Sequence, residues 1–179
     1  MRKVISGMFV SLDGVAGAPD KWQGDLFDED MERAMGTAIA NMDTALMGRV
    51  TYQEWQPFWP GSSIEPYASF INNVPKFVFS KTLEHVDWQN TTLVKSPLAE
   101  KVNELKRMPG KDIGVQGSIS LQRSLIAANL LDEVMLAIHP VVAGQGKRYF
   151  NDSDELRRFK LIDCKTSGSG VVMATYQLR

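Results

Sequence analysis

The stretch DIGVQGSISLQRSLIAANLLDEVMLAIH, residues 112–139, decides the fold. The segment 112–116 predicts a strand, the segment 118–131 predicts a helix, and the segment 133–139 predicts a second strand. Two strands joined through a helix form a βαβ unit, in which both strands run parallel. The stretch therefore predicts an α/β protein built on a parallel sheet.

The same alternation continues on both sides of this unit. Toward the C-terminus, the segments 159–166 and 171–178 predict two strands, and the turn SGSG at 167–170 joins them as an antiparallel hairpin. The expected architecture is a mainly parallel sheet with helices on both faces and this hairpin at its end. Toward the N-terminus, strands are predicted at 4–12, 44–47, 76–80 and 91–95, and helices at 28–41, 50–55, 67–73 and 97–107.

Length and composition fit one domain, residues 1–179, with 44% hydrophobic and 23% charged residues. The 20 basic and 21 acidic residues give a formal net charge of −1 without a basic block, which argues against nucleic acid and anionic membranes as partners. One cysteine, Cys164, and two histidines exclude a disulfide framework and a Cys/His zinc site, so no metal is expected. No apolar run fits a membrane span or a signal peptide, so we expect a cytoplasmic protein.

Three predicted strands end in residues that suit a phosphate group. In an open α/β sheet, ligands bind at the carboxyl ends of the strands, and helix starts there supply free N–H groups. Each motif alone also has a structural interpretation, for example Ser118 as a helix N-cap. Together they predict a phosphate-rich ligand across this edge of the sheet. The motifs are Met47-Gly48-Arg49-Val50-Thr51, Phe79-Ser80-Lys81-Thr82 and Val115-Gln116-Gly117-Ser118.

Two familiar nucleotide-binding fingerprints are absent. No G-x-G-x-x-G follows the first strand, and the run Gly144-Gln145-Gly146-Lys147-Arg148 lacks both the spacing of a P-loop and the Ser or Thr after lysine. A dinucleotide, if one binds, therefore uses a different α/β arrangement.

The order of these motifs resembles a known family. The pattern also includes Ser11-Leu12-Asp13-Gly14 after the first strand, Leu131-Asp132-Glu133-Val134, and the run from His139 to Gly146. The set is similar to the dihydrofolate-reductase-like superfamily, in the branch of the reductase domain of riboflavin biosynthesis, over about positions 2 to 178. The resemblance implies a three-layer fold around a mostly parallel sheet of about eight strands, with NADPH as the hydride donor.

The resemblance also implies one group of NADPH contacts at each strand end. The motif Met47–Thr51 would hold the adenosine-side phosphates, with Arg49 at the 2′-phosphate. The motif Phe79–Thr82 would flank the ribose, and the motif Val115–Ser118 would lie at the pyrophosphate and nicotinamide. A Cβ at Gly117 would take the space of the ligand or force an unfavourable dihedral angle. The predicted contacts are Gly48, Arg49, Thr51, Ser80, Lys81, Thr82, Gln116, Gly117 and Ser118.

The chain departs from the family pattern beside the third strand end. The family's paired glycine is Gly117-Ser118 here, and the glutamate that riboflavin reductases often carry before it is Gln116. A neutral amide can hydrogen-bond a substrate, but it cannot act as a carboxylate base or counter-charge. The departure weakens the argument for a phosphoribosyl-pyrimidine substrate and leaves the argument for the cofactor intact.

Hydride transfer to a C=N or C=O group requires a proton source, often a carboxyl group or a bound water. Asp13, after the first strand, and Asp28, at the start of the next helix, are the candidate carboxyls. Both also have a structural interpretation, Asp13 in a turn and Asp28 as a complement to the helix dipole. Trp22, Trp55 and Phe58 are candidates to stack on a flat substrate, with core or dimer packing as the alternative.

We expect an NADPH-dependent oxidoreductase that reduces a small heterocycle, a pyrimidine or a pteridine. Its activity would be most similar to the 5-amino-6-(5-phosphoribosylamino)uracil reductase of riboflavin biosynthesis or to dihydrofolate reductase. Two alternatives stay open: a reductase of an unrelated carbonyl or quinone, and a nucleotide-binding module without catalysis. A homodimer is further predicted by the resemblance, by the Pro-rich segment that holds Trp55, Phe58 and Trp59, and by apolar residues on the exposed edges of the terminal strands.

Overall fold

The computed structural model describes residues 1–179, in which strands and helices alternate as predicted. No helix is both long enough and apolar enough to cross a membrane. The strands are β1 (Val4–Ser11), β2 (Met42–Gly48), β3 (Lys76–Phe79), β4 (Thr91–Val94), β5 (Asp112–Val115), β6 (Glu133–His139), β7 (Phe159–Thr166) and β8 (Val172–Leu178). The helices are α1 (Glu29–Ala40), α2 (Arg49–Trp55), α3 (Tyr67–Asn73), α4 (Leu98–Arg107) and α5 (Ile119–Ala127), with short 3-10 helices η1 (Pro19–Lys21) and η2 (Trp59–Gly61).

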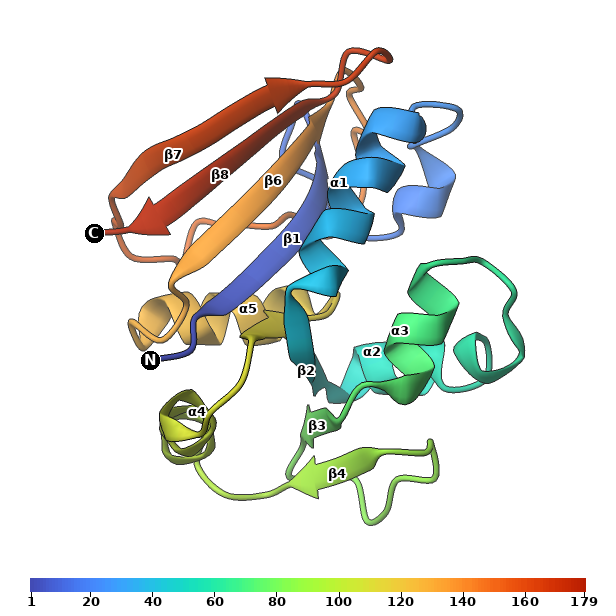
Figure 1. The fold of residues 1–179 in the computed structure, drawn as a ribbon. Coiled ribbons are helices and arrows are strands. Elements are labelled where there is room, and N and C mark those ends of the chain that lie inside the picture. Colours follow the sequence, from blue (N-terminus) through green and yellow to red (C-terminus); the bar gives the residue numbers. More distant parts are fainter.

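All eight strands form one sheet in the order β4-β3-β2-β5-β1-β6-β8-β7. Neighbouring strands pair in parallel from β4 to β6, whereas β8 is antiparallel to both β6 and β7. Figure 1 shows β7 at one edge of this sheet and β4 at the other. The predicted mostly parallel sheet with a C-terminal antiparallel hairpin is confirmed.

The chain reverses its direction across the sheet between β5 and β1. From β1 it passes through α1 to β2 on one side, and from β5 it passes through α5 to β6 on the other side. Crossovers in opposite directions place α1 and α5 on opposite faces of the sheet (Figure 1). A crevice opens beyond the strand ends at such a point, so this topology predicts a ligand site beside β1 and β5.

Two apolar layers hold the helices against the sheet. Alternate residues of β1, such as Val4 and Val10, pack with Leu105 of α4 and Leu125 of α5 in the larger core. On the opposite face, Met47 of β2 packs with buried side chains of α1 and α3. The molecule therefore has three layers, with the sheet in the middle.

Helix α5 departs furthest from the prediction, because it ends at Ala127 and not at residue 131. Asn129 adopts a left-handed conformation with a φ of 54°, and the N–H of Leu130 donates to the carbonyl of Leu125 at 2.8 Å. This geometry closes a helix, usually with glycine in the left-handed position. Leu130 and Leu131 then turn into the core, which explains why their apolar character suggested a longer helix.

The C-terminal hairpin is the least covered part of the sheet. Nearly every residue of β7 is exposed. On the side of α1, Met31 of that helix packs against Ala137 of β6 and Met173 of β8, whereas Figure 1 shows no helix over β7. One edge of β7 has no neighbouring strand. Free strand edges of this kind pair readily with another chain.

Candidate functional site

A cleft of about 2220 Å³ lies beyond the carboxyl ends of the central strands and extends along α1. It brings together most of the residues that the sequence predicted. Three predicted residues, Asp13, Asp28 and Thr82, are not part of its lining. The predicted residues that do line it are Trp22, Gly48, Arg49, Thr51, Trp55, Phe58, Ser80, Lys81, Gln116, Gly117 and Ser118.

Positive charge gathers at the ends of three neighbouring strands. The register of β2, β3 and β4 places Arg49, Ser80 and Lys95 in one row just beyond the strands, which lie about 4.8 Å apart. Lys81 lines the same part of the cleft, and none of the three cations has a carboxylate partner. Arg49 donates only to the amide oxygen of Gln53, at 2.8 Å. We call Arg49, Lys81 and Lys95 the cationic arm, which suits a phosphate group.

Sequence reasoning missed Lys95, although its place at the end of a predicted strand is the signal that singled out the other two cations. The neighbouring Ser80 forms a local turn: its Oγ accepts hydrogen bonds from the N–H groups of Thr82 at 3.2 Å and Leu83 at 3.0 Å. This turn fixes the backbone of the loop and leaves Thr82 outside the cleft lining.

Hydrogen bonds join the start of α2 to the turn between β5 and α5. The N–H and the hydroxyl of Ser118 both donate to Thr51 Oγ1, at 2.9 and 2.6 Å. The N–H of Gly48 donates to Ser118 Oγ at 2.7 Å. The side chain of Ser118 therefore does not cap α5. The hydroxyls of Thr51 and Ser118 instead connect the start of α2 to the turn before α5.

Gly117 packs closely against α2. Its φ is 53°, and the φ of Ser118 is 47°, so two consecutive residues are left-handed. A Cβ on Gly117 would lie 3.0 Å from Thr51 Cγ2 and 3.2 Å from Trp55 Cζ2. The unfavourable dihedral angle expected from the sequence is present, and a side chain there would also meet the protein atoms of α2.

A buried chain of hydrogen bonds fixes the carbonyl of this turn. Gln122 of α5 is fully buried, and its Nε2 donates to Gly117 O at 2.5 Å, while its Oε1 accepts from the Tyr149 hydroxyl at 2.8 Å. Burial raises the pKa of Tyr149, so its hydroxyl remains a donor. No sequence pattern pointed to Gln122 or Tyr149, because packing between distant segments brings them together.

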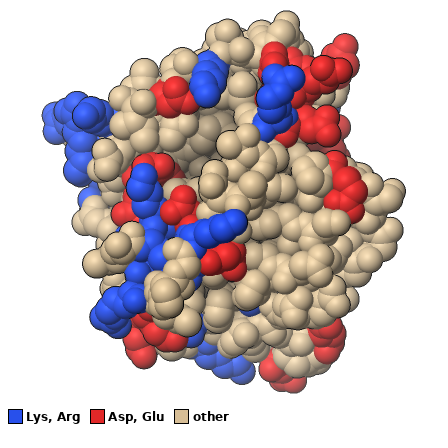
Figure 2. All heavy atoms as spheres, viewed as in Figure 1, with Lys and Arg blue, Asp and Glu red and all other residues tan.

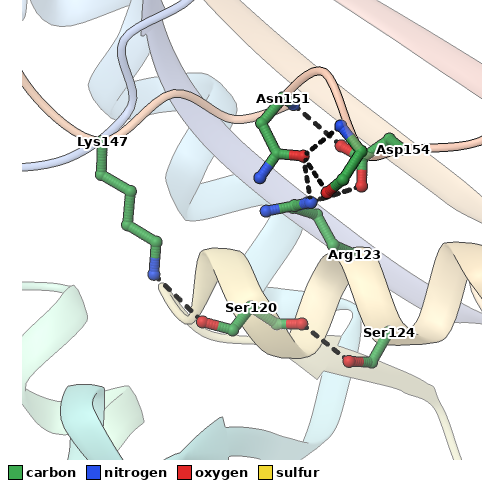
Figure 3. A network of polar contacts seen from close by, with 7 residues as sticks. Ser120, Arg123, Ser124, Lys147, Asn151 and Asp154 are labelled. Carbon is green, nitrogen blue, oxygen red and sulfur yellow. Dashed lines mark hydrogen bonds and ion pairs between the residues drawn. The ribbon is translucent and has the colours of Figure 1, made fainter.

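Surface contacts tie the loop before β7 to α5 (Figure 3). Arg123 donates to Asn151 Oδ1 at 2.6 Å and to the carboxylate of Asp154, and Lys147 Nζ donates to Ser120 Oγ at 3.0 Å. The hydrogen bond from Arg123 lowers the pKa of Asp154. Since Lys147 lines the cleft beside the first turn of α5, this loop brings a further cation to the site.

The other end of the cleft is apolar and aromatic. The ring centres of Trp55, Phe58 and Tyr67 lie 5.9, 5.1 and 4.8 Å from that of Trp59. Met35 of α1 packs against the same cluster. We call Met35, Trp55, Phe58, Trp59 and Tyr67 the aromatic arm, since all five line the cleft. Figure 2 shows few charged side chains on this side of the molecule, over α2 and α3.

Trp22, the remaining predicted aromatic residue, is held by its own loop. Its Nε1 donates to Gly17 O at 3.0 Å, and its ring centre lies 5.3 Å from that of His139, edge to face. Burial lowers the pKa of His139, and its neutral ring contacts Ala137 O through Nδ1 at 2.9 Å and Gln23 Nε2 through Nε2 at 3.1 Å. Trp22 therefore lines the cleft with its orientation fixed.

Gln116 lies next to Gly117, where the two arms meet. It is buried, and its Oε1 accepts from the Tyr67 hydroxyl at 2.7 Å. Its Nε2 has only Met42 Sδ as a partner, at 3.5 Å. Gln116 lines the cleft, and its Nε2, which lies over Gly114 beside Met42, is a hydrogen-bond donor with only a weak acceptor.

Asp13 holds the loop after β6 and does not line the cleft. Its carboxylate accepts hydrogen bonds from the Ser11 hydroxyl at 2.6 Å and from the N–H groups of Ala143 at 3.0 Å and Gly144 at 2.9 Å. These bonds, led by that from Ser11, lower the pKa of Asp13 to about 2. These contacts give Asp13 a structural role in the loop after β6, and the catalytic role expected from the sequence stays a prediction.

Asp28 caps α1 and anchors the turn between β7 and β8. It accepts hydrogen bonds from the N–H groups of Met31 at 3.1 Å and Ser169 at 2.7 Å. Desolvation by itself raises the pKa of Asp28, but these bonds outweigh it and lower the pKa to about 2. The cap and helix-dipole interpretation of Asp28 agrees with these contacts, and its role as a proton donor stays a prediction.

Comparison with known proteins identifies the family. The chain matches the family model described as the RibD C-terminal domain over residues 2–173. YyaP of Bacillus subtilis (strain 168), a protein of uncharacterized function, is 33% identical to this chain over 180 residues, which cover 98% of this chain and 94% of YyaP.

Two solved structures share the fold at low sequence identity. A protein from Shewanella sp. PV-4, provisionally assigned to riboflavin biosynthesis, has a TM-score of 0.81 at 20% identity, with 99% of both chains covered. Dihydrofolate reductase from Enterococcus faecalis, complexed with NADP(H), has a TM-score of 0.65 at 12% identity, with 99% of this chain and 96% of that chain covered. The fold is therefore dihydrofolate-reductase-like. Within that class, the chain belongs to the RibD C-terminal domain family, a family of reductase domains.

Proposed function

We propose that this chain is an NADPH-dependent reductase of a small heterocycle. The observation that carries the proposal is the cationic arm, whose three cations have no carboxylate partner and lie beside the turn at Gly117. A dinucleotide with a 2′-phosphate requires such a cluster at its adenosine end. Membership of a reductase family, and a fold shared with a dihydrofolate reductase complexed with NADP(H), support the same cofactor.

The residues of the chain fit this cofactor in two places. The cationic arm would hold the adenosine-side phosphates, and the turns joined by Thr51 and Ser118 would lie along the pyrophosphate, with Gly117 keeping the backbone close. When bound, the cofactor supplies a hydride to the carbon of a C=N or C=O group, the heteroatom of that group takes a proton, and the cofactor leaves oxidised.

The aromatic arm would orient the substrate ring and exclude water from the two faces of the ring. With the carboxylates of Asp13 and Asp28 bound to backbone amides, we assign the proton to a water molecule admitted by the cleft. The single exposed cysteine, Cys164, agrees with a cytoplasmic location.

Calorimetric titration with NADPH and NADH tests the cofactor. We expect NADPH to bind about 10- to 100-fold more tightly, because a charge-assisted contact contributes about 1.5–3 kcal/mol. Arg49→Ala should remove most of this preference, whereas Lys160→Ala, which removes an exposed cation of β7 outside the cleft, should keep it. Equal affinities for NADPH and NADH in the parent protein would contradict the proposal.

A turnover assay distinguishes the proposed reductase from the two alternative functions, a reductase of an unrelated carbonyl or quinone and a nucleotide-binding module without catalysis. We expect NADPH oxidation in the presence of pteridines or pyrimidines. Oxidation with quinones or simple carbonyls alone would favour the unrelated reductase, and NADPH binding without oxidation by any of these compounds would favour the nucleotide-binding module.

We also propose that the chain forms a homodimer through β7. This edge strand exposes Leu161 by 51% and Ile162 by 43%, and its free edge can pair with the same strand of a second copy. Sedimentation at micromolar concentration should give a species of twice the 20.0 kDa of the chain. Ile162→Lys should give the monomer, whereas Phe58→Ser in the aromatic arm should not. A monomeric parent protein would contradict the proposal.

A further inference from the structure

We propose that Lys147 is a cofactor-binding residue whose ammonium group pairs with the pyrophosphate of the bound dinucleotide. The inference rests on the proposed reductase function and adds to the site a residue from the loop between β6 and β7. Three features of the structure carry it: the fixed backbone of Lys147, the lack of an anionic partner for its side chain, and its place across the Gly117 turn from the cationic arm.

The backbone of Lys147 is held against the loop after β1. Its carbonyl accepts hydrogen bonds from the N–H groups of Ala16 at 2.8 Å and Gly17 at 2.9 Å. The next residue, Arg148, pairs with Val15 in an isolated antiparallel bridge. A Cβ on Gly17 would lie 3.0 Å from Lys147 Cβ, so the two loops are in close contact. The start of the Lys147 side chain therefore has a fixed position relative to β1.

From this position the side chain of Lys147 extends to α5. Figure 3 shows it directed from its loop toward the first turn of that helix, where Nζ donates to Ser120 Oγ at 3.0 Å. Ser120, Ser124 and Lys147 all line the cleft. The ammonium group therefore lies at the wall of the cleft.

The ammonium group of Lys147 has no anionic partner. It can donate three hydrogen bonds, and its one partner in the protein is the neutral hydroxyl of Ser120. Arg123, about one turn further along α5, differs, because Asp154 and Asn151 bind its guanidinium (Figure 3). A hydroxyl does not neutralise a positive charge, so the charge of Lys147 is available to an anion in the cleft.

Carboxylates also line the cleft, but none of them forms an ion pair with this ammonium group. Three of these carboxylates, Asp30, Glu133 and Asp163, pair with other cations. The other two, Asp20 and Glu54, form no ion pair. An anionic ligand beside the ammonium group therefore displaces no carboxylate from it.

The Gly117 turn separates Lys147 from the cationic arm. The strands lie in the order β4-β3-β2-β5-β1, and the residues of the cationic arm follow β2, β3 and β4. The turn of Gly117 and Ser118 follows β5, and the loop that holds the backbone of Lys147 follows β1. A ligand that extends from the cationic arm across this turn therefore approaches Lys147 on the far side.

This order matches the order of the anionic groups along NADPH. The 2′-phosphate lies on the adenosine ribose, and the pyrophosphate lies between the two nucleosides. With the 2′-phosphate at Arg49, the pyrophosphate would follow at the turn, where Lys147 would pair with it. NADH carries the same pyrophosphate and lacks the 2′-phosphate. Lys147 therefore contributes affinity for both dinucleotides, and Arg49 contributes the preference between them.

Calorimetric titration of Lys147→Ala with NADPH and with NADH tests this division. We expect both affinities to fall about five- to tenfold, because one partly exposed charge-assisted contact is lost. The ratio of the two affinities should stay within about twofold of the parent ratio, whereas Arg49→Ala should change that ratio. Lys147→Arg keeps the charge and should restore most of both affinities.

Lys21→Ala is the matched control for the loss of one positive charge. Lys21 also lines the cleft without a carboxylate partner, but no side-chain hydrogen bond fixes its position. Its removal should change neither affinity by more than about twofold, because a mobile exposed cation contributes little. An equal loss in Lys21→Ala and Lys147→Ala would mean that the net charge of the cleft, and not a contact of Lys147, determines the affinity, and it would overturn the inference.

Ser120→Ala separates ligand binding from a structural role of Lys147. If Lys147 served only to hold its loop on α5, removing the Ser120 hydroxyl would weaken both dinucleotides as much as removing the lysine. We expect Ser120→Ala to keep both affinities within about twofold of the parent, because the ammonium group remains and only its neutral partner is lost. The salt dependence of NADH binding should decrease in Lys147→Ala and stay unchanged in Ser120→Ala.

Unchanged affinities in Lys147→Ala, a loss of NADPH affinity alone, or an equal loss in Ser120→Ala would each overturn the inference. The proposed function fails in a different way, through a parent protein that binds NADPH and NADH equally. A parent protein that prefers NADPH, with a Lys147→Ala variant that binds both dinucleotides as tightly as the parent, retains the proposed function and loses this inference.

Discussion

The cationic arm and the aromatic arm line one cleft but are built in different ways. The cationic arm stands at the ends of three parallel strands, whose hydrogen-bonding register places its side chains in one row. The aromatic arm comes from helices and a loop, and contacts between rings hold it together. In the proposed function this difference separates two tasks: the rigid sheet carries the charge for the cofactor, and the more variable helices and loops shape the space for the substrate.

We expect the largest effect from a substitution at Gly117, where the two arms meet, because both NADPH and pteridines should then bind more weakly. Gly117→Ala places a Cβ against Thr51 and Trp55 at a φ of 53°, so the turn must move away from α2. We expect NADPH affinity to fall about 100-fold or more and stability to fall by about 1–3 kcal/mol, measured by calorimetry and by thermal unfolding. Pteridine affinity should fall as well, because Trp55 belongs to the aromatic arm.

Gly144→Ala is the matched control for this prediction. Gly144 also has a positive φ, 72°, but no atom lies within 4 Å of its Cβ position, and it does not line the cleft. This variant should lose some stability and keep its affinity for NADPH. A folded Gly117→Ala protein with unchanged NADPH affinity would show that the cofactor does not lie beside this turn.

Tyr149→Phe should distinguish the two arms, because it should lower NADPH affinity slightly and leave pteridine affinity unchanged. The variant leaves Gln122 Oε1 buried without its partner, which should lower stability by about 1–3 kcal/mol in urea unfolding. Because Gln122 keeps its bond to Gly117, NADPH affinity should fall only about threefold, and pteridine affinity should not change. Loss of stability without any loss of NADPH affinity would mean that this buried chain supports the core and does not position the turn.

The smallest effect is expected at Asp28, at the start of the helix that carries Met35 of the aromatic arm. Its pKa is lowered to about 2, so the folded state favours the ionised form. The stability this contributes is present above about pH 4 and is lost as the pH falls through about 2. Asp28→Asn should flatten this acid-side loss in urea unfolding measured between these pH values, and ligand affinities at neutral pH should stay near those of the parent.

Asp25→Asn, at an exposed position of the same loop, is the control, and it should leave the acid-side profile unchanged. An Asp28→Asn protein with the same acid-side profile as the parent would show that the carboxylate does not anchor the hairpin turn.

Most of the fold was predictable because its signals are local. Apolar periodicity and turn residues located every strand and α-helix but neither of the short 3-10 helices. The error at the end of α5 arose because Leu130 and Leu131 look helical but follow a left-handed Asn129. Arg49 and Lys81 of the cationic arm were predictable for a related reason: parallel strands end at one edge of the sheet, so residues that follow the strands in sequence become neighbours. Lys95 was missed although it follows the same rule.

The sequence by itself determined the order of the elements, the parallel sheet with its closing hairpin, and the strand ends where charge collects. Only the tertiary structure decided how individual polar groups are used. It bound Asp13 and Asp28 to backbone amides, locked Gln116 against Tyr67, and connected Gly117 to Tyr149 through Gln122. Secondary structure depends on neighbours in the chain, whereas the partner of a buried polar group depends on which distant segments pack together.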